Sequence, residues 1–99
     1  MTRNLLTESK ANRLADLFRT LSDTSRVRII SALLEKEMSV GVLATMLRMS
    51  ESAVSHQLRG LRQLRIIRRR KQGRRVFYSL VDEHLEQMFR MGLDHVEHS

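Results

Sequence analysis

The sequence predicts a mainly α-helical domain in which four helices precede a β-hairpin and one final helix. Proline is absent and only four glycines occur among 99 residues, so residues that favour helices dominate. Two short segments near the middle each begin with a serine that can cap a helix, and a tight connection separates them. The arginine-rich stretch that follows has the alternation and the glycine typical of a β-hairpin.

The first two helices are indicated by apolar periodicity. Apolar residues recur at helical spacing from Leu14 to Leu21, which predicts an amphipathic helix from about residue 8 to residue 21. Asp23 can cap a second helix, which we expect to be mostly buried and to end at the polar run 35–37.

Two short helices are expected next. Ser39 can cap a helix that runs through Leu47, and Ser50 can cap another after the two-residue connection Arg48–Met49. Two capped helices this close together are typical of a helix-turn-helix motif.

The second helix of this pair has two chemically different faces. Val54, Leu58 and Leu61 lie within about 60° of one another on a helix and should pack inward. The opposite face carries side chains that can reach base edges and phosphates in a DNA major groove. The residues of this face that we take as DNA-binding candidates are Ser52, Ser55, His56 and Arg59. We add Val40, at the start of the preceding helix.

A basic hairpin follows. Residues 66–70 and 75–80 read as short strands, joined by residues 71–73, where Gly73 can supply the positive φ of a tight turn. The chain has 18 Lys and Arg against 11 Asp and Glu, a formal charge of +7, and many of the basic residues lie here, which favours a polyanionic partner. A helix-turn-helix followed by such a hairpin is a winged helix, and the wing residues expected at the DNA backbone are Arg70, Lys71, Arg74 and Arg75.

The last predicted helix carries an apolar stripe from Leu85 to Val96 and three of the four histidines. His84 and His95 share one flank, but about 16 Å of helix separates them, so they cannot hold one ion within a chain. Pairing of two antiparallel copies of this helix would bring His84 of one protomer opposite His95 and His98 of the other.

Such a homodimer would form two equivalent sites. Each would hold Asp82 and His84 from one protomer and His95 and His98 from the other, four nitrogen and oxygen ligands that suit tetrahedral Zn(II) and are acceptable to Co(II). Asp82 and His84 do not share a face of a regular helix, so this arrangement requires non-helical backbone at Asp82. Without such pairing, these histidines would belong to an ordinary solvent-exposed terminal helix.

Composition excludes several classes of function. Cysteine is absent, which excludes disulfides, thiolate metal sites and cysteine nucleophiles. We find no nucleophile with a base at usable spacing and expect no enzymatic activity. We further expect a single domain over residues 1–99, no membrane association and a cytoplasmic location, because no long apolar run or secretory signal is evident.

Residues 50–64 resemble the recognition helix of the ArsR/SmtB family of metal-responsive repressors. Leu21–Asp23 leading into Arg26 resembles that family's entry to its second helix, and residues 70–74 resemble its wing. The family's pattern of Asp-x-His, ten residues, then His-x-x-His falls on Asp82, His84, His95 and His98. The resemblance implies a homodimeric winged-helix repressor that binds a palindromic operator without metal and is released by zinc or cobalt.

One departure from the family and two alternatives bear on this expectation. The stretch 38–43 lacks the cysteine motif that many relatives carry, which argues against sensing of arsenic, lead or cadmium there. The alternatives are a repressor of the same fold with a non-metal inducer, and an architectural protein that coats double-stranded DNA without sequence preference.

Overall fold

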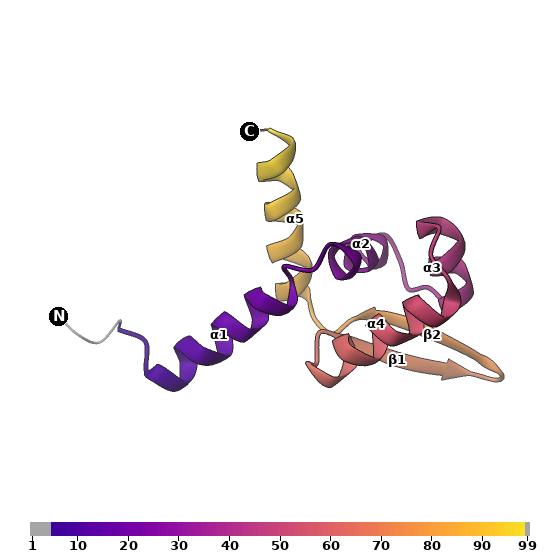
Figure 1. Cartoon of the computed structure of the whole chain (residues 1–99), viewed down its shortest axis with the longest axis horizontal. Coiled ribbons are helices and arrows are strands. Elements are labelled where there is room, and N and C mark those ends of the chain that lie inside the picture. Colours follow the sequence, from indigo (N-terminus) through magenta and orange to yellow (C-terminus); the bar gives the residue numbers. More distant parts are fainter. Residues whose placement is uncertain (1–4, 99) are drawn as a thin grey trace.

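The chain folds into five helices and one β-hairpin in a computed structural model that describes residues 5–98 (Figure 1). The predicted order α-α-α-α-β-β-α is confirmed. The elements are α1 (Glu8–Thr20), α2 (Thr24–Leu33), α3 (Val40–Leu47), α4 (Glu51–Gln63), β1 (Ile67–Gln72), β2 (Arg75–Leu80) and α5 (Glu83–Glu97).

The helix starts follow from local capping. Asp23, Ser39 and Ser50 have extended backbone, and each side chain accepts a hydrogen bond from the backbone N–H three residues later, as the sequence predicts. These caps satisfy donors that a helix start leaves unpaired. The tight connection after α3 is made possible by Arg48, which adopts left-handed backbone at φ 55°.

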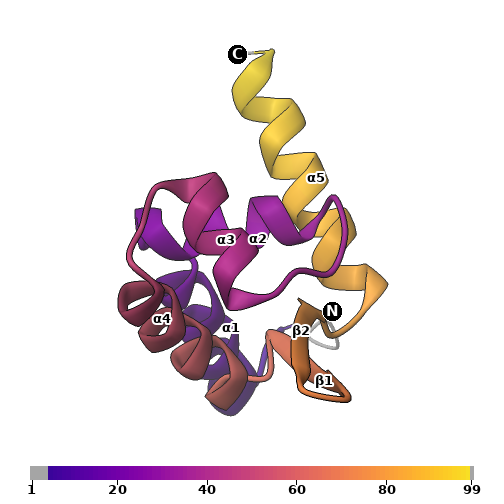
Figure 2. The ribbon, with the colours of Figure 1, turned by 90° about the vertical axis from the view of Figure 1, so that its right-hand side faces the viewer.

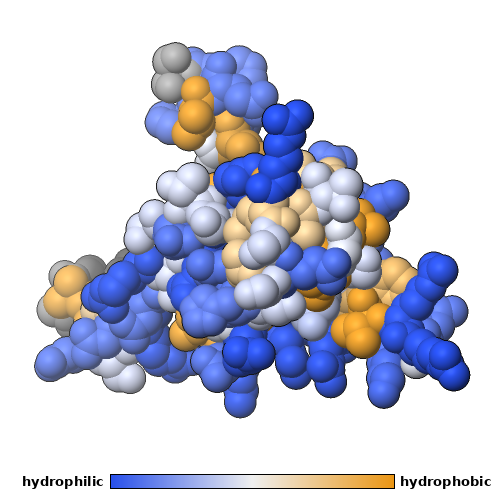
Figure 3. Space-filling model, turned by 45° about the vertical axis from the view of Figure 1, so that its right-hand side comes forward, coloured by the Kyte–Doolittle hydropathy of each residue, from blue (hydrophilic) through white to orange (hydrophobic). Residues whose placement is uncertain are grey.

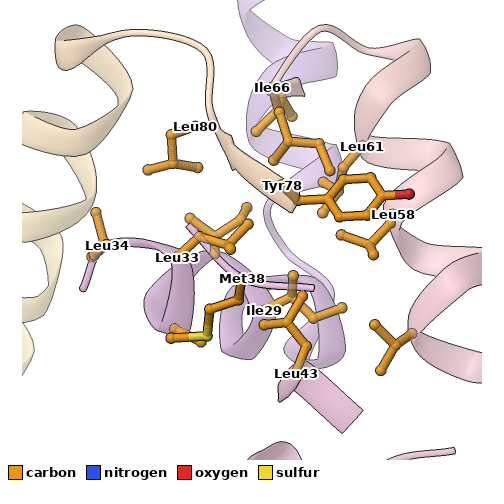
Figure 4. Close-up of a cluster of buried hydrophobic side chains, with 14 of the residues drawn as sticks. Ile29, Leu33, Leu34, Met38, Leu43, Leu58, Leu61, Ile66, Tyr78 and Leu80 are labelled. Carbon is orange, nitrogen blue, oxygen red and sulfur yellow. The ribbon is translucent and has the colours of Figure 1, made fainter. Parts of the chain in front are cut away.

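The hydrophobic core lies between α2, α3, α4 and the hairpin. Ile29 and Ile30 of α2 are fully buried, as are Leu43 of α3 and Leu61 of α4. Figure 4 shows Tyr78 of β2 pointing toward the side chains of α4. Burial of these side chains, at about 1.5–3 kcal/mol each, fixes α4 against the rest of the motif.

The hairpin is longer at its tip than predicted. We expected the first strand at residues 66–70 and the turn at 71–73; instead β1 runs to Gln72, which pairs with Arg75, and the turn is Gly73–Arg74. Gly73 has φ 62°, which confirms its role in the turn. The base of the hairpin is anchored by Met38, whose backbone exchanges two hydrogen bonds with Tyr78 at 3.0 and 2.8 Å.

Helix α5 and much of α1 project from this core (Figures 1 and 2). None of the residues of α5 is buried; Leu85 and Phe89 are only partly covered by the core. Among residues 5–98, no helix has the length and apolar character needed to cross a membrane.

Candidate functional site

Helix α4 presents the polar face that the sequence predicts. Val54, Leu58 and Leu61 are buried, whereas Ser52, His56 and Arg59 are exposed and Ser55 is half-buried. Figure 1 places α4 and the hairpin along one edge of the molecule, away from α5, and Figure 3 shows hydrophilic side chains along that edge. Hydroxyl, imidazole and guanidinium groups of α4 are therefore available to a ligand that approaches from this side.

Besides its buried core residues, α4 is held by an arginine of α2. Arg26 Nε donates a hydrogen bond of 2.9 Å to Gln57 Oε1 in the middle of α4. Gly60, one turn further, leaves room for this contact, because a Cβ there would lie 3.1 Å from Arg26 Nη2. Arg28, also of α2, donates to the Leu47 carbonyl at the end of α3 at 2.7 Å. Two arginines of one helix thus hold both helices of the motif.

The wing residues divide into two groups. Arg70 Nε donates to Glu37 Oε2 at 3.2 Å, its Nη2 donates to the other carboxylate oxygen, and its guanidinium lies 5.0 Å from the Phe77 ring centroid. Through this hydrogen bonding, the Arg70 guanidinium holds the pKa of Glu37 below its usual value. Arg70 therefore braces the middle of the wing through Glu37, while Lys71, Arg74 and Arg75 lie nearer the tip and are exposed.

Val40 is placed differently from the other DNA-binding candidates. It is half-buried and packs against the core, and together with Ser39, Arg74 and Arg75 it lines a hollow of about 550 Å³ between α3 and β2. Its position near two wing arginines would allow a contact with the DNA backbone, whereas its side chain contributes mainly to packing of the core.

The candidate metal ligands lie at the two ends of α5. Asp82 has extended backbone, with φ −156° and ψ 170°, which is the non-helical geometry that sharing a site with His84 requires. Its Oδ1 accepts a hydrogen bond of 3.0 Å from the Leu85 N–H, and His84 Nδ1 lies 4.0 Å from the same oxygen. The two predicted ligands are thus neighbours at the N-terminus of α5.

The other two candidates occupy the C-terminal turn. The His98 Nδ1–H donates to the Asp94 carbonyl oxygen at 2.8 Å and lies 3.2 Å from Asp94 Oδ1, so the neutral ring keeps its lone pair on Nε2. His95 is exposed. Within a single copy of residues 5–98, no three His, Asp or Glu side chains come together in a group that could hold a metal.

An apolar groove runs along the flank between α5 and the core. It has a volume of about 370 Å³ and is lined by Phe18, Leu21, Val27, Met88, Phe89, Gly92, Leu93 and Val96. Phe18 and Val96 are 55% and 70% exposed, and Met91 is 73% exposed. Exposed apolar surface of this kind, from α1 and α5 together, is characteristic of a protein–protein interface.

The structure places further polar residues around the candidate site. Arg62, which belongs to the basic stretch of the sequence, and Gln63 are exposed on α4 and follow Arg59 at helical spacing, but neither is among the predicted DNA-binding residues. Gln57 and Glu37 support the site by accepting hydrogen bonds from Arg26 and Arg70, which lie 31 and 33 residues away in the chain. No local pattern indicates such pairs.

Comparison with known proteins gives a consistent result. Residues 23–69 match the model of a protein family that is described as "Bacterial regulatory protein, arsR family". A transcriptional repressor SmtB homolog of Synechocystis is 46% identical over 90 residues, and a cadmium resistance regulatory protein CadC homolog of Staphylococcus aureus is 44% identical over 75 residues. The crystal structure of the antimony-specific transcriptional repressor AntR superposes with a TM-score of 0.86 at 33% identity.

The extent of these matches differs. The aligned region covers 91% of the chain and 68% of the SmtB homolog, but 75% of the chain and only 62% of the CadC homolog. For AntR it covers 97% of the chain and 87% of that structure. These similar proteins are regulators of transcription, not enzymes.

Proposed function

The chain belongs to the arsR family of bacterial regulatory proteins, and on that premise we propose that it is a metal-responsive transcriptional repressor. Two copies form a homodimer that binds a palindromic operator when metal-free. Zn(II), or Co(II), held between the two C-terminal helices, lowers operator affinity. The observation that supports this proposal is that four candidate nitrogen and oxygen ligands lie at the two ends of α5, beside an exposed apolar groove.

Operator binding rests on the polar face of α4. Ser52, Ser55, His56 and Arg59 would contact base edges, while Lys71, Arg74 and Arg75 of the wing add salt-dependent contacts to phosphates. Two recognition helices related by a dimer axis would have to lie about 34–36 Å apart to enter successive major grooves. The charge of +7 favours this association at low salt.

Dimerisation rests on the apolar groove. A second copy of the chain is the natural occupant, because the exposed apolar residues of α1 and α5 recur on each protomer and an isologous contact buries both sets at once. Antiparallel pairing of two α5 helices across this groove would place the N-terminal ligands of one helix near the C-terminal ligands of the other.

The ligand chemistry fits zinc or cobalt. Asp82 and His84 would hold the ion together with His95 and His98 of the partner subunit, two sites per dimer, and the Nδ1–H bond of His98 leaves Nε2 for the metal. When bound, the metal supplies a rigid link between two helices from different protomers. The name of the CadC homolog refers to cadmium resistance and that of AntR to antimony, which supports a metal effector in general, and the name of the SmtB homolog refers to transcriptional repression.

The test is a zinc titration of the apo protein on a fluorescent operator fragment at fixed salt, followed by a chelator. We expect zinc to release the DNA at about one ion per protomer and the chelator to restore binding. His95→Ala should bind the operator normally and resist release, whereas Gln87→Ala, an exposed α5 control, should behave as wild type. Normal release from His95→Ala would refute the site.

Two other outcomes identify the alternatives. Tight, specific operator binding that zinc does not change indicates the same fold with a non-metal inducer. A ratio near one between operator and competitor DNA affinity indicates an architectural DNA-coating protein.

A further inference from the structure

We infer that Arg90 is a positioning residue that couples α5 to the wing through the segment 34–38. This inference rests on the proposed function, because it names the route by which a change at α5 reaches the DNA-binding surface. Arg90 lies on α5 between the two groups of candidate ligands and touches neither group.

The first contact joins α5 to the end of α2. Arg90 Nη2 donates a hydrogen bond of 2.8 Å to the carbonyl oxygen of Leu34, the C-cap of α2. A guanidinium at a helix C-terminus pairs with an otherwise unused carbonyl and with the negative end of the helix dipole. Figure 4 shows Leu34 beside the ribbon of α5, and Figure 2 shows the connection from α2 running past α5 before it enters α3.

The second set of contacts joins the same segment to the wing. Three residues after Leu34, Glu37 accepts hydrogen bonds from Arg70 of β1, and Met38 exchanges two backbone hydrogen bonds with Tyr78 of β2. The segment is therefore tied to α5 at one end and to both strands of the hairpin at the other.

A movement of α5 affects its apolar contacts and its Arg90 hydrogen bond differently. Leu85 and Phe89 pack against the core through apolar groups, and such contacts tolerate small shifts of a helix. The Arg90 hydrogen bond is directional and loses strength when its geometry changes. A rotation or translation of α5 is thus transmitted to Leu34, and from there to Glu37 and Met38, which are hydrogen-bonded to the two strands of the wing.

The coupling test uses Arg90→Met, which keeps an apolar stem and removes the donor, together with Glu37→Gln and the double variant. The measured quantity is the ratio of operator Kd with saturating zinc to operator Kd without it. We expect each single variant to reduce this ratio at least fivefold, and the double variant to reduce it no further, because both act on one connection. Gln87→Met is the matched α5 control and should stay within twofold of wild type.

A second measurement does not depend on zinc. In the metal-free protein, hydrogen exchange of the Met38 and Tyr78 amides should be at least fivefold faster in Arg90→Met than in wild type or Gln87→Met, with the Leu58 amide unchanged. If zinc has no effect on wild-type operator binding, the proposed function fails and this exchange measurement alone decides the inference.

Several outcomes would overturn the inference. The first is a ratio of operator Kd with and without zinc that stays within twofold of wild type in Arg90→Met. The second is a double variant in which the effects of Arg90→Met and Glu37→Gln multiply. The third is hydrogen exchange of the Met38 and Tyr78 amides that does not change in Arg90→Met. Acceleration shared equally by the Leu58 amide would show a general loss of stability instead of a local connection.

Discussion

Asp82 offers a test that separates two roles of one carboxylate. Its Oδ1 caps α5 by accepting the Leu85 N–H at 3.0 Å, and the proposed function gives the same side chain to a metal. Capping needs only one oxygen and no charge, so asparagine can replace aspartate as a cap. Metal binding uses the charge. The variants Asp82→Asn and Asp82→Ala should therefore differ in stability and agree in their loss of metal affinity.

The expected magnitudes follow from these contacts. Asp82→Ala removes the cap and should lower stability by about 1 kcal/mol per protomer, or roughly 4–8 °C in Tm for a domain of this size. Asp82→Asn should cost only a few tenths of a kcal/mol, because the cap remains and part of the favourable interaction with the helix dipole is lost. Both variants should weaken zinc binding at least as much as the roughly 10–100-fold that loss of an outer-shell partner causes.

The assays are urea unfolding of metal-free protein at one fixed protein concentration and zinc affinity by competition with a chromogenic chelator. Fixed concentration is needed because the stability of a dimer depends on it. If Asp82→Asn destabilises the apo protein as much as Asp82→Ala does, the capping argument is wrong. If Asp82→Asn binds zinc like wild type, Asp82 is not a ligand.

Three further predictions test other parts of the molecule. Arg59→Ala should weaken operator binding by about 1–3 kcal/mol, measured by anisotropy, and leave zinc binding intact, whereas full operator affinity would remove Arg59 from the interface. Leu93→Asp, in the apolar groove, should shift the protein toward monomer in sedimentation experiments, and an unchanged dimer would place the interface elsewhere. Because hydrogen bonding to Arg70 lowers the pKa of Glu37, this pairing stabilises the fold above the ordinary pKa of a glutamate, and the stabilisation is lost as pH falls through the lower folded pKa. Glu37→Gln should therefore make unfolding stability less dependent on pH in the acidic range, and an identical pH profile would contradict this.

The elements of the fold were predictable because their signals are local. Asp23, Ser39 and Ser50 cap the helices that follow them, and each is recognisable from its residue type and the apolar spacing after it. The requirement for extended backbone at Asp82 also followed from helix geometry, and the structure meets it.

The errors and omissions concern contacts between distant parts of the chain. The sequence pattern ends β1 two residues too early, because pairing of Gln72 with Arg75, not the apolar pattern, sets the length of the hairpin. Arg70 looks like any other wing arginine in the sequence, yet Glu37 engages it from 33 residues away. The grouping of ligands from two protomers lies outside one chain and stays a prediction.

The lack of burial along α5 ties its order to protein concentration. All 15 of its residues remain at least partly open to solvent in one protomer, and a helix of this length is only marginally stable in water without packing. Under the proposed dimerisation, mass action governs the order of this helix: dilution favours protomers whose last helix frays, which also disturbs the geometry of the candidate ligands at both ends. Under the proposed function, the amount of repressor in the cell sets both how much operator is occupied and how many complete metal sites exist.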